Sequence, residues 1–303
     1  MMNMTVFRWC VGLVLGAIGL AAAEVAPDPY TQEIDTWRAQ RLAGLTKPDG
    51  WLTLVGLHFL SPGENSVGTA PDNKVVLAAG PAHLGMFTLD QYGQVKVMFN
   101  PGIEALVDGH SVLAADLRDD TRTKPAVVSV GSVSLYVITR EGKKALRVKD
   151  SAAETRGHFL GLDYFPIDPT WRIEAQWVPF DKPREVPIRN ILGGVSPAMI
   201  LGKAVFTRAG QTFELLPIQE DPDGLLFFVI SDSTSGDQTY AAARFLYAAP
   251  EVDGKVIIDF NKAQNPPCAF TTFATCPLPP KENQLPIAVT AGEKKYRGHE
   301  EKP

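Results

Sequence analysis

Cysteine and histidine are scarce in this chain, and the spacings that they adopt in metal sites are absent. The 303 residues include three cysteines, at positions 10, 268 and 276, and five histidines, at positions 58, 83, 110, 158 and 299. No pair of histidines stands at the spacing of metal ligands, and a structural zinc ion needs four ligands. We therefore expect no metal site and no cofactor.

Motifs for catalysis and nucleotide binding are also missing. The chain contains no G-x-S-x-G elbow, no H-E-x-x-H pair, no P-loop and no G-x-G-x-x-G turn. Its net charge is −5 and neither sign forms a long run, whereas a nucleic-acid-binding protein needs a basic face. We expect no nucleic acid partner, and the sequence leaves open whether the protein is an enzyme.

Long hydrophobic runs are absent except at the N-terminus. Arg8 precedes an uncharged stretch that extends from Trp9 to Ala23. With a second small residue at Ala21, this order is typical of a secretory signal and its cleavage site. A membrane span needs about 20 apolar residues, which is more than this stretch contains. We predict a signal peptide over residues 1–23 and no membrane span after cleavage, and an uncleaved anchor is the alternative.

Export changes how the cysteines are interpreted. A protein without its first 23 residues retains only Cys268 and Cys276. In the periplasm or outside the cell, a pair this close in sequence favours a disulfide, which would contribute about 2–3 kcal/mol in the chain-entropy model. Zinc is the rival interpretation, but no histidine or further cysteine lies nearby. We therefore predict a Cys268–Cys276 disulfide in a periplasmic or secreted protein.

One helix is expected at the start of the mature chain. Asp28 can cap its N-terminus, Pro29 suits the first helical position, and Gly44 can end it after three to four turns. The residues at helical spacing are Tyr30, Ile34, Trp37, Arg41 and Leu45.

Strand patterns dominate the rest of the sequence. Residues 171–177 alternate between apolar and polar, and residues 225–230 are continuously apolar, as in a buried strand. Short strands recur at intervals of roughly 8–12 residues, which is typical of sandwiches and barrels. The fold class predicted is mainly β, with antiparallel sandwich or barrel-like sheets and a short N-terminal helix.

The domain organisation follows from a break in this strand rhythm near residue 151. We expect the helix and a β subdomain over residues 24–150, and a β-rich subdomain with the Cys268–Cys276 loop over residues 151–290. The polar residues 291–303 are expected to form a frayed tail.

The best candidate for a site lies where two predicted strands end. A buried strand stops abruptly at the polar run from Ser231 to Asp237, whose side chains can hydrogen-bond backbone amides. Arg244 follows in apolar surroundings and needs a carboxylate partner, for which Asp232 and Asp259 are the natural candidates. The predicted rim is made of Asp232, Thr234, Tyr240, Arg244, Asp259, Asn261 and Asn265.

Several longer stretches are similar to a known family. "SDSTSGDQTYAAARFL", "IIDFNKAQNPPCAF", "ATCPLPPKENQLPIAVTAGEK" and "TRGHFLGLDYFPIDPTWRIEAQW" resemble the family catalogued as domain of unknown function 1684. The resemblance covers most of the mature chain, implies a β-rich protein with this cysteine pair, and implies no reaction. The chain departs from the family pattern before Arg244, where alanines at 241–243 replace the expected glycines.

Three hypotheses about function follow. The first is a binding protein that holds a small polar ligand or a cell-envelope partner at the predicted rim. The second is a hydrolase in which Asp232 or Asp259 is the general base, Arg244 stabilises an anion and His158 assists. The third is a structural envelope protein without a pocket. They differ in whether the rim surrounds an open concavity or is enclosed in the core.

Overall fold

The helix at the start of the described chain is longer than the sequence predicted. The computed structural model describes residues 28–121, 124–218 and 224–299, so the predicted signal peptide lies outside the described residues. Helix α1 (Pro29–Thr46) begins at Asp28, whose Oδ1 accepts from the backbone amides of Tyr30 and Thr31. It continues through Gly44, so the predicted end there is wrong. The helix stops because Lys47 precedes a proline, which favours the extended conformation (ψ 151°) found at Lys47.

The first β body, residues 54–150, contains a six-stranded and a five-stranded sheet in the orders β1-β11-β10-β9-β6-β7 and β3-β2-β4-β5-β8. Side chains from both sheets, including Val67, Phe87, Val128 and Leu135, form one hydrophobic core. The strands are β1 (Leu54–Phe59), β2 (Gly63–Gly68), β3 (Val75–Val76), β4 (Gly85–Leu89), β5 (Val95–Phe99), β6 (Leu106–Val107), β7 (His110–Ser111), β8 (Ala114–Leu117), β9 (Val127–Val130), β10 (Val133–Arg140) and β11 (Lys143–Asp150).

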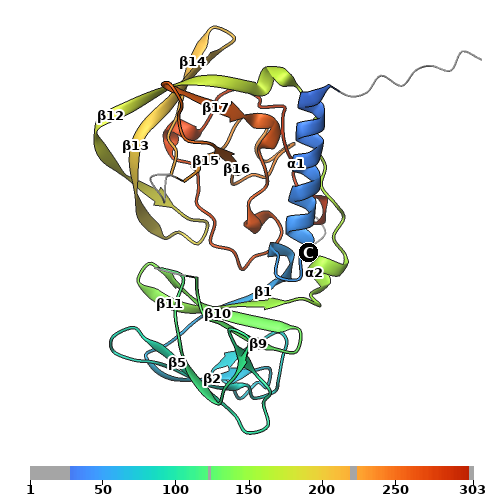
Figure 1. Cartoon of the computed structure of the whole chain (residues 1–303), viewed down its shortest axis with the longest axis vertical. Helices are drawn as coiled ribbons and strands as arrows, with labels where there is room; N and C mark the ends of the chain where they lie inside the picture. The colour runs from blue at the N-terminus through green and yellow to red at the C-terminus, as the bar shows by residue number, and fades with distance from the viewer. Residues whose placement is uncertain (1–27, 122–123, 219–223, 300–303) are drawn as a thin grey trace, which may run out of the picture.

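The second β body, residues 172–259, holds a four-stranded sheet in the order β14-β13-β12-β17 and the two-stranded sheet β15-β16. The residues after it, 260–294, form a strap whose Phe260, Leu285 and Val289 belong to the hydrophobic core of this body. The strands are β12 (Arg172–Arg189), β13 (Val195–Arg208), β14 (Gln211–Leu215), β15 (Leu226–Ile230), β16 (Arg244–Ala248) and β17 (Lys255–Asp259). Figure 1 shows the two bodies one above the other.

Short helical turns connect these parts, and no helix in the described ranges is long and apolar enough to cross a membrane. The turns are η1 (Trp51–Thr53), α2 (Glu154–Gly157), η2 (Pro169–Trp171), η3 (Phe260–Lys262), η4 (Pro267–Ala269), η5 (Lys281–Asn283) and η6 (Arg297–His299). All the strand pairs except β2–β3 are antiparallel. The predicted fold class, mainly β with antiparallel sheets and an N-terminal helix, is confirmed.

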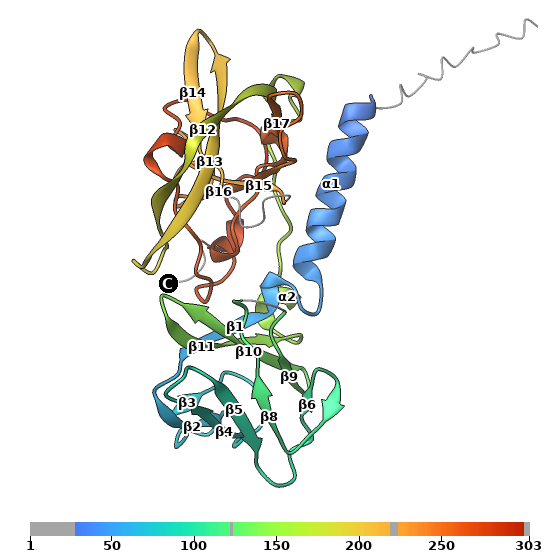
Figure 2. The ribbon, with the colours of Figure 1, turned by 60° about the vertical axis from the view of Figure 1, so that its left-hand side comes forward.

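Helix α1 packs on the second body although it comes first in the chain (Figure 2). The Tyr30 hydroxyl donates to Asp259 Oδ1 at 2.9 Å. Near the other end of the helix, Arg41 Nε lies 2.8 Å from Glu293 Oε1, and the Glu293 side chain is fully buried. The expectation of a frayed tail is therefore wrong at Glu293, because that carboxylate is the counter-charge of Arg41.

Candidate functional site

Two residues of the predicted rim, Asp232 and Arg244, are enclosed in the second body. Arg244 Nη2 lies 2.7 Å from Asp232 Oδ2, and their side chains are 1% and 0% exposed. The guanidinium also donates to the carbonyls of Val289 and Ala291 in the strap. Burial lowers the pKa of Arg244, and the Asp232 carboxylate opposes that shift. The two charges therefore balance each other inside the core, although Arg244 Nε has no acceptor among the described residues, and the pair offers no open face to a ligand.

Asp259, the other carboxylate of the predicted rim, does not pair with Arg244. Its Oδ1 accepts from the Tyr30 hydroxyl and from the backbone amide of Asn261. Burial, followed by this contact with Asp259, raises the pKa of Tyr30. The side-chain amide of Asn261 donates to the backbone carbonyl of Asp168. This group of side chains holds helix α1 against the second body.

The remaining rim residues also have structural contacts. Thr234 is buried and its hydroxyl donates to Asp232 Oδ1 at 2.6 Å. Asn265 donates from its backbone to Glu293 Oε2 and from its side chain to the carbonyl of Lys294. The Tyr240 hydroxyl donates to the carbonyl of Cys268 at 3.2 Å. The predicted rim is therefore not an open site, because its residues are buried except for the half-buried Tyr240.

The burial of the rim also argues against the hydrolase hypothesis, because both proposed general bases belong to it. As whole residues, Asp232 and Asp259 are only 7% and 5% exposed, and neither lines the hollow that His158 lines. His158 lines a separate hollow of about 280 Å³ with Glu154, Thr272 and Tyr296. Nothing at the predicted rim therefore combines a base with an accessible substrate position.

The two cysteines of the strap lie side by side. The backbone amide of Cys268 donates to Cys276 Sγ at 3.1 Å, and both residues are buried. The structure carries them as free thiols, so it does not show the predicted disulfide, which stays a prediction.

A larger cavity lies where the two bodies face each other. This cleft has a volume of about 820 Å³, within the range of small-molecule sites. None of the seven rim residues lines it. Its residues include three arginines, an aspartate and a group of aromatic side chains: Asp120, Arg140, Arg147, Arg189, Trp51, Phe227, Phe245 and Tyr247, with Thr275 and Cys276 from the strap.

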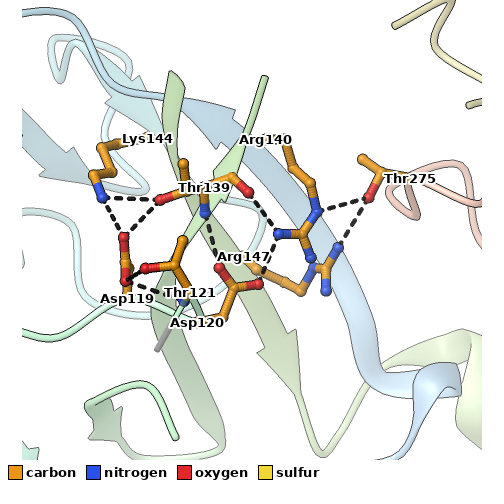
Figure 3. A network of polar contacts seen from close by, with 8 residues as sticks. All are labelled: Asp119, Asp120, Thr121, Thr139, Arg140, Lys144, Arg147 and Thr275. Carbon is orange, nitrogen blue, oxygen red and sulfur yellow. Dashed lines mark hydrogen bonds and ion pairs between the residues drawn. The ribbon is translucent and has the colours of Figure 1, made fainter. Parts of the chain in front are cut away.

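Two arginines of the first body converge on the strap (Figure 3). Arg140 Nε donates to Thr275 Oγ1 at 3.3 Å, and Arg147 Nη2 donates to the same oxygen at 3.4 Å. Both distances exceed the 2.7–3.2 Å of ordinary N–H···O hydrogen bonds, so the hydroxyl satisfies neither guanidinium well. The contacts nevertheless place cationic groups from the first body and a hydroxyl from the strap at one point.

The carboxylates nearest to these arginines are already neutralised. Arg140 Nη1 lies 2.7 Å from Asp120 Oδ2. Asp119 is paired with Lys144 and also accepts from the Thr139 hydroxyl. Burial raises the pKa of Asp119, but the hydrogen bonds from Lys144 and its neighbours outweigh burial and lower the pKa. Neither aspartate is left to balance a further positive charge.

Arg147 is the group without a counter-charge. It is 5% exposed, and among the described residues no carboxylate lies within ion-pair distance of it. Its Nε is buried with no hydrogen-bond acceptor in the described part of the chain. The Trp51 ring, 5.4 Å from the guanidinium carbon, provides only a weak cation–π contact. An uncompensated buried charge at the wall of a cleft is an anion-binding feature.

The cleft supports binding better than covalent chemistry. Among the described residues no histidine lines it, and Asp120 is engaged by Arg140. The Cys276 thiol lines it, but hydrogen bonding with Cys268 and burial raise the pKa of this thiol, which favours the protonated form. What the side chains offer is a pair of guanidiniums, a hydroxyl and an aromatic wall.

Sequence reasoning missed this site although the sequence contains a signal for it. Arg147 stands between Leu146 and Val148 in strand β11, which has a neighbouring strand on each side, and all three residues are buried. An arginine inside an apolar strand needs a partner, which is the argument that singled out Arg244. The pairing of Thr275 with residues more than a hundred positions earlier has no such signal.

Comparisons with known proteins extend over the second part of the chain. The family model described as "Protein of unknown function (DUF1684)" matches residues 157–294. The solution NMR structure of an uncharacterised protein from Haloarcula marismortui is 32% identical, over 46% of this chain and 78% of that chain, with a TM-score of 0.39. No curated protein matches. The segment matched by the family model includes Thr275, whereas Arg140 and Arg147 precede it.

Proposed function

We propose that this chain, which belongs to the family of proteins of unknown function DUF1684, binds a small anionic ligand in the cleft between its two β bodies. The observation that carries the proposal is Arg147, whose guanidinium is buried at the wall of the cleft and has no carboxylate partner among the described residues. A buried charge without a partner is strongly destabilising. A bound anion would supply that partner.

The chemistry around Arg147 supports an oxyanion. Carboxylate and phosphate groups form short, paired hydrogen bonds with guanidinium edges. Among the described residues, the Nε of Arg147 has no acceptor, and its Nη2 makes the long contact with Thr275. An oxyanion near Thr275 would also meet Arg140, which is held in position by Asp120. Ligand binding would then join the first body to the strap.

Replacing Arg147 with methionine tests this proposal. In the wild type, inorganic phosphate or acetate at constant ionic strength is expected to raise the melting temperature and to give a titration in calorimetry. Arg147→Met should weaken binding by roughly 10- to 100-fold, the loss of charged hydrogen bonds. Because the variant removes an uncompensated buried charge, its own melting temperature should be equal to or higher than that of the wild type.

A matched control is Arg118→Met. Arg118 is an exposed arginine of the first body that pairs with Asp108 at 2.7 Å and does not line the cleft. This variant should bind both anions as the wild type does. The proposal fails when neither anion binds the wild type, or when Arg147→Met and Arg118→Met respond alike.

We also propose that the protein is exported and acts in the periplasm or outside the cell, where the ligand or an envelope partner is met. The support is the order of charge, apolar stretch and small residues in positions 1–23. The proximity of Cys268 and Cys276 supports a disulfide in that compartment.

Thiol counting tests export and the disulfide together. Protein recovered from the periplasm or the medium, denatured without reductant, should show no free thiol, because cleavage removes Cys10 and the remaining pair is oxidised. The same chain without residues 1–23, made in the cytoplasm, should show two. Two free thiols in exported protein would refute the disulfide, and full-length protein found only in the cytoplasm would refute export.

A further inference from the structure

Part of the wall of the cleft is aromatic. Strands β15 and β16 form a two-stranded sheet in which Phe227 is paired with Tyr247 and Val229 with Phe245. Because side chains alternate along a strand, one face carries Phe228 and Leu246 into the core of the second body. The other face carries Phe227, Phe245 and Tyr247, and all three line the cleft.

These rings contact one another and become more exposed toward Tyr247. Phe227 meets Phe245 edge to face, with ring centroids 4.8 Å apart. Phe227 and Tyr247 are stacked, with centroids 4.8 Å apart and planes 13° from parallel. Phe245 is 6% exposed, whereas Tyr247 is 43% exposed. The apolar surface therefore increases in exposure toward Tyr247, inside the concavity.

The size of the cleft also argues for more than an oxyanion. A volume of about 820 Å³ is far larger than a phosphate or carboxylate group fills. Aliphatic side chains of Ile188, Met199 and Ile218 line much of the remaining space. Small-molecule sites combine such apolar walls with a few polar groups that fix orientation.

We propose that the ligand carries a planar aromatic group next to its oxyanion, so that its ring packs against Phe227 and Tyr247 while the oxyanion meets Arg147. This inference rests on the proposed anion site and names the class of ligand. Stacked or edge-to-face rings gain stability beyond the area that they bury. Among the described residues that line the cleft, Arg147 and the exposed Arg189 are the cations that Asp120 does not neutralise, so we expect a ligand with one or two negative charges.

Paired probes test the inference. Calorimetric titrations would compare acetate with benzoate and inorganic phosphate with phenyl phosphate, with cyclohexanecarboxylate as an apolar acid without an aromatic ring. Benzoate should bind about tenfold more tightly than acetate, and phenyl phosphate should show the same advantage over phosphate. The stronger of the two aromatic anions identifies the oxyanion as carboxylate or phosphate.

Tyr247→Leu is the informative variant, because leucine keeps an apolar side chain and removes the ring. It should reduce the ratio of the benzoate affinity to the acetate affinity to less than about threefold. Tyr92→Leu is the control, since Tyr92 is 79% exposed and does not line the cleft. Arg147→Met should weaken all the anions alike.

The outcomes separate this inference from the proposed function. Equal binding of acetate and benzoate, equal binding of cyclohexanecarboxylate and benzoate, or an unchanged benzoate affinity in Tyr247→Leu would overturn the aromatic ligand. In each of these cases a loss of binding in Arg147→Met would still support the anion site. Failure of every anion to bind the wild type would remove both.

Discussion

Replacing Asp232 with alanine is expected to lower the free energy of unfolding by about 3–5 kcal/mol, the usual effect of breaking a buried ion pair. The variant leaves the Arg244 guanidinium in the core, where the pair's side chains are 1% and 0% exposed. It also removes the acceptor of the Thr234 hydroxyl and of the Val289 amide. Urea denaturation of the wild type and the variant measures the difference.

A control carboxylate separates burial from simple loss of charge. Asp72 has a side chain that is 72% exposed and lies 3.8 Å from His83, so Asp72→Ala should change the free energy of unfolding by less than about 0.5 kcal/mol. The double variant Asp232→Ala/Arg244→Met should recover part of the stability, because it no longer buries a lone charge. A loss below about 1 kcal/mol in Asp232→Ala would contradict the enclosed pair.

The pairing of Arg244 with a carboxylate could be predicted from the sequence, but its enclosure could not. Local sequence shows that Arg244 stands among apolar residues and that Asp232 ends the preceding strand. The strap encloses the pair, and its backbone carbonyls at Val289 and Ala291 accept hydrogen bonds from the Arg244 guanidinium. These contacts join residues more than forty positions apart, and no periodic pattern in the sequence indicates them.

The strand pattern predicted the fold class because alternation and turn residues are local. Gly109, Gly131 and Gly210 each adopt positive φ in the turns that join paired strands, where glycine is favoured. The end of helix α1 was misplaced because a glycine inside a helix is tolerated at a cost of about 1 kcal/mol, while Pro48 is the stronger stop.

Arg147 and Arg244 show why burial alone does not identify a site. Both stand in strands among apolar neighbours, and both are at most 5% exposed. Arg244 has a carboxylate at 2.7 Å and two carbonyls, so its charge is balanced within the fold. Arg147 has a long hydrogen bond to the Thr275 hydroxyl and a cation–π contact with the Trp51 ring. The balanced arginine is a stability element, and the unbalanced one is where a ligand gains most.

Replacing Glu293 with alanine is expected to destabilise the protein by about 3 kcal/mol, although the sequence alone places this residue in a polar tail. Its fully buried carboxylate accepts from Arg41 Nε at 2.8 Å and from the Asn265 amide at 2.7 Å. Without it, helix α1 keeps a charge whose side chain is 13% exposed and has lost its counter-charge. Thermal and urea denaturation measure the loss, and hydrogen exchange in α1 should increase before the rest of the protein unfolds.

Glu214→Ala provides the matched comparison for this variant. Glu214 pairs with Lys203 at 2.6 Å, but its side chain is 45% exposed, and a surface pair contributes at most about 1 kcal/mol. The double variant Arg41→Met/Glu293→Ala should be more stable than Glu293→Ala alone. The reason is that the second substitution removes the Arg41 charge that Glu293→Ala leaves without a partner. If Glu293→Ala behaves like Glu214→Ala, the last described residues of the chain do not anchor the helix. If Glu293→Ala is destabilised as expected, the polar segment around Glu293 holds helix α1 to the second body through the buried ion pair of Glu293 with Arg41.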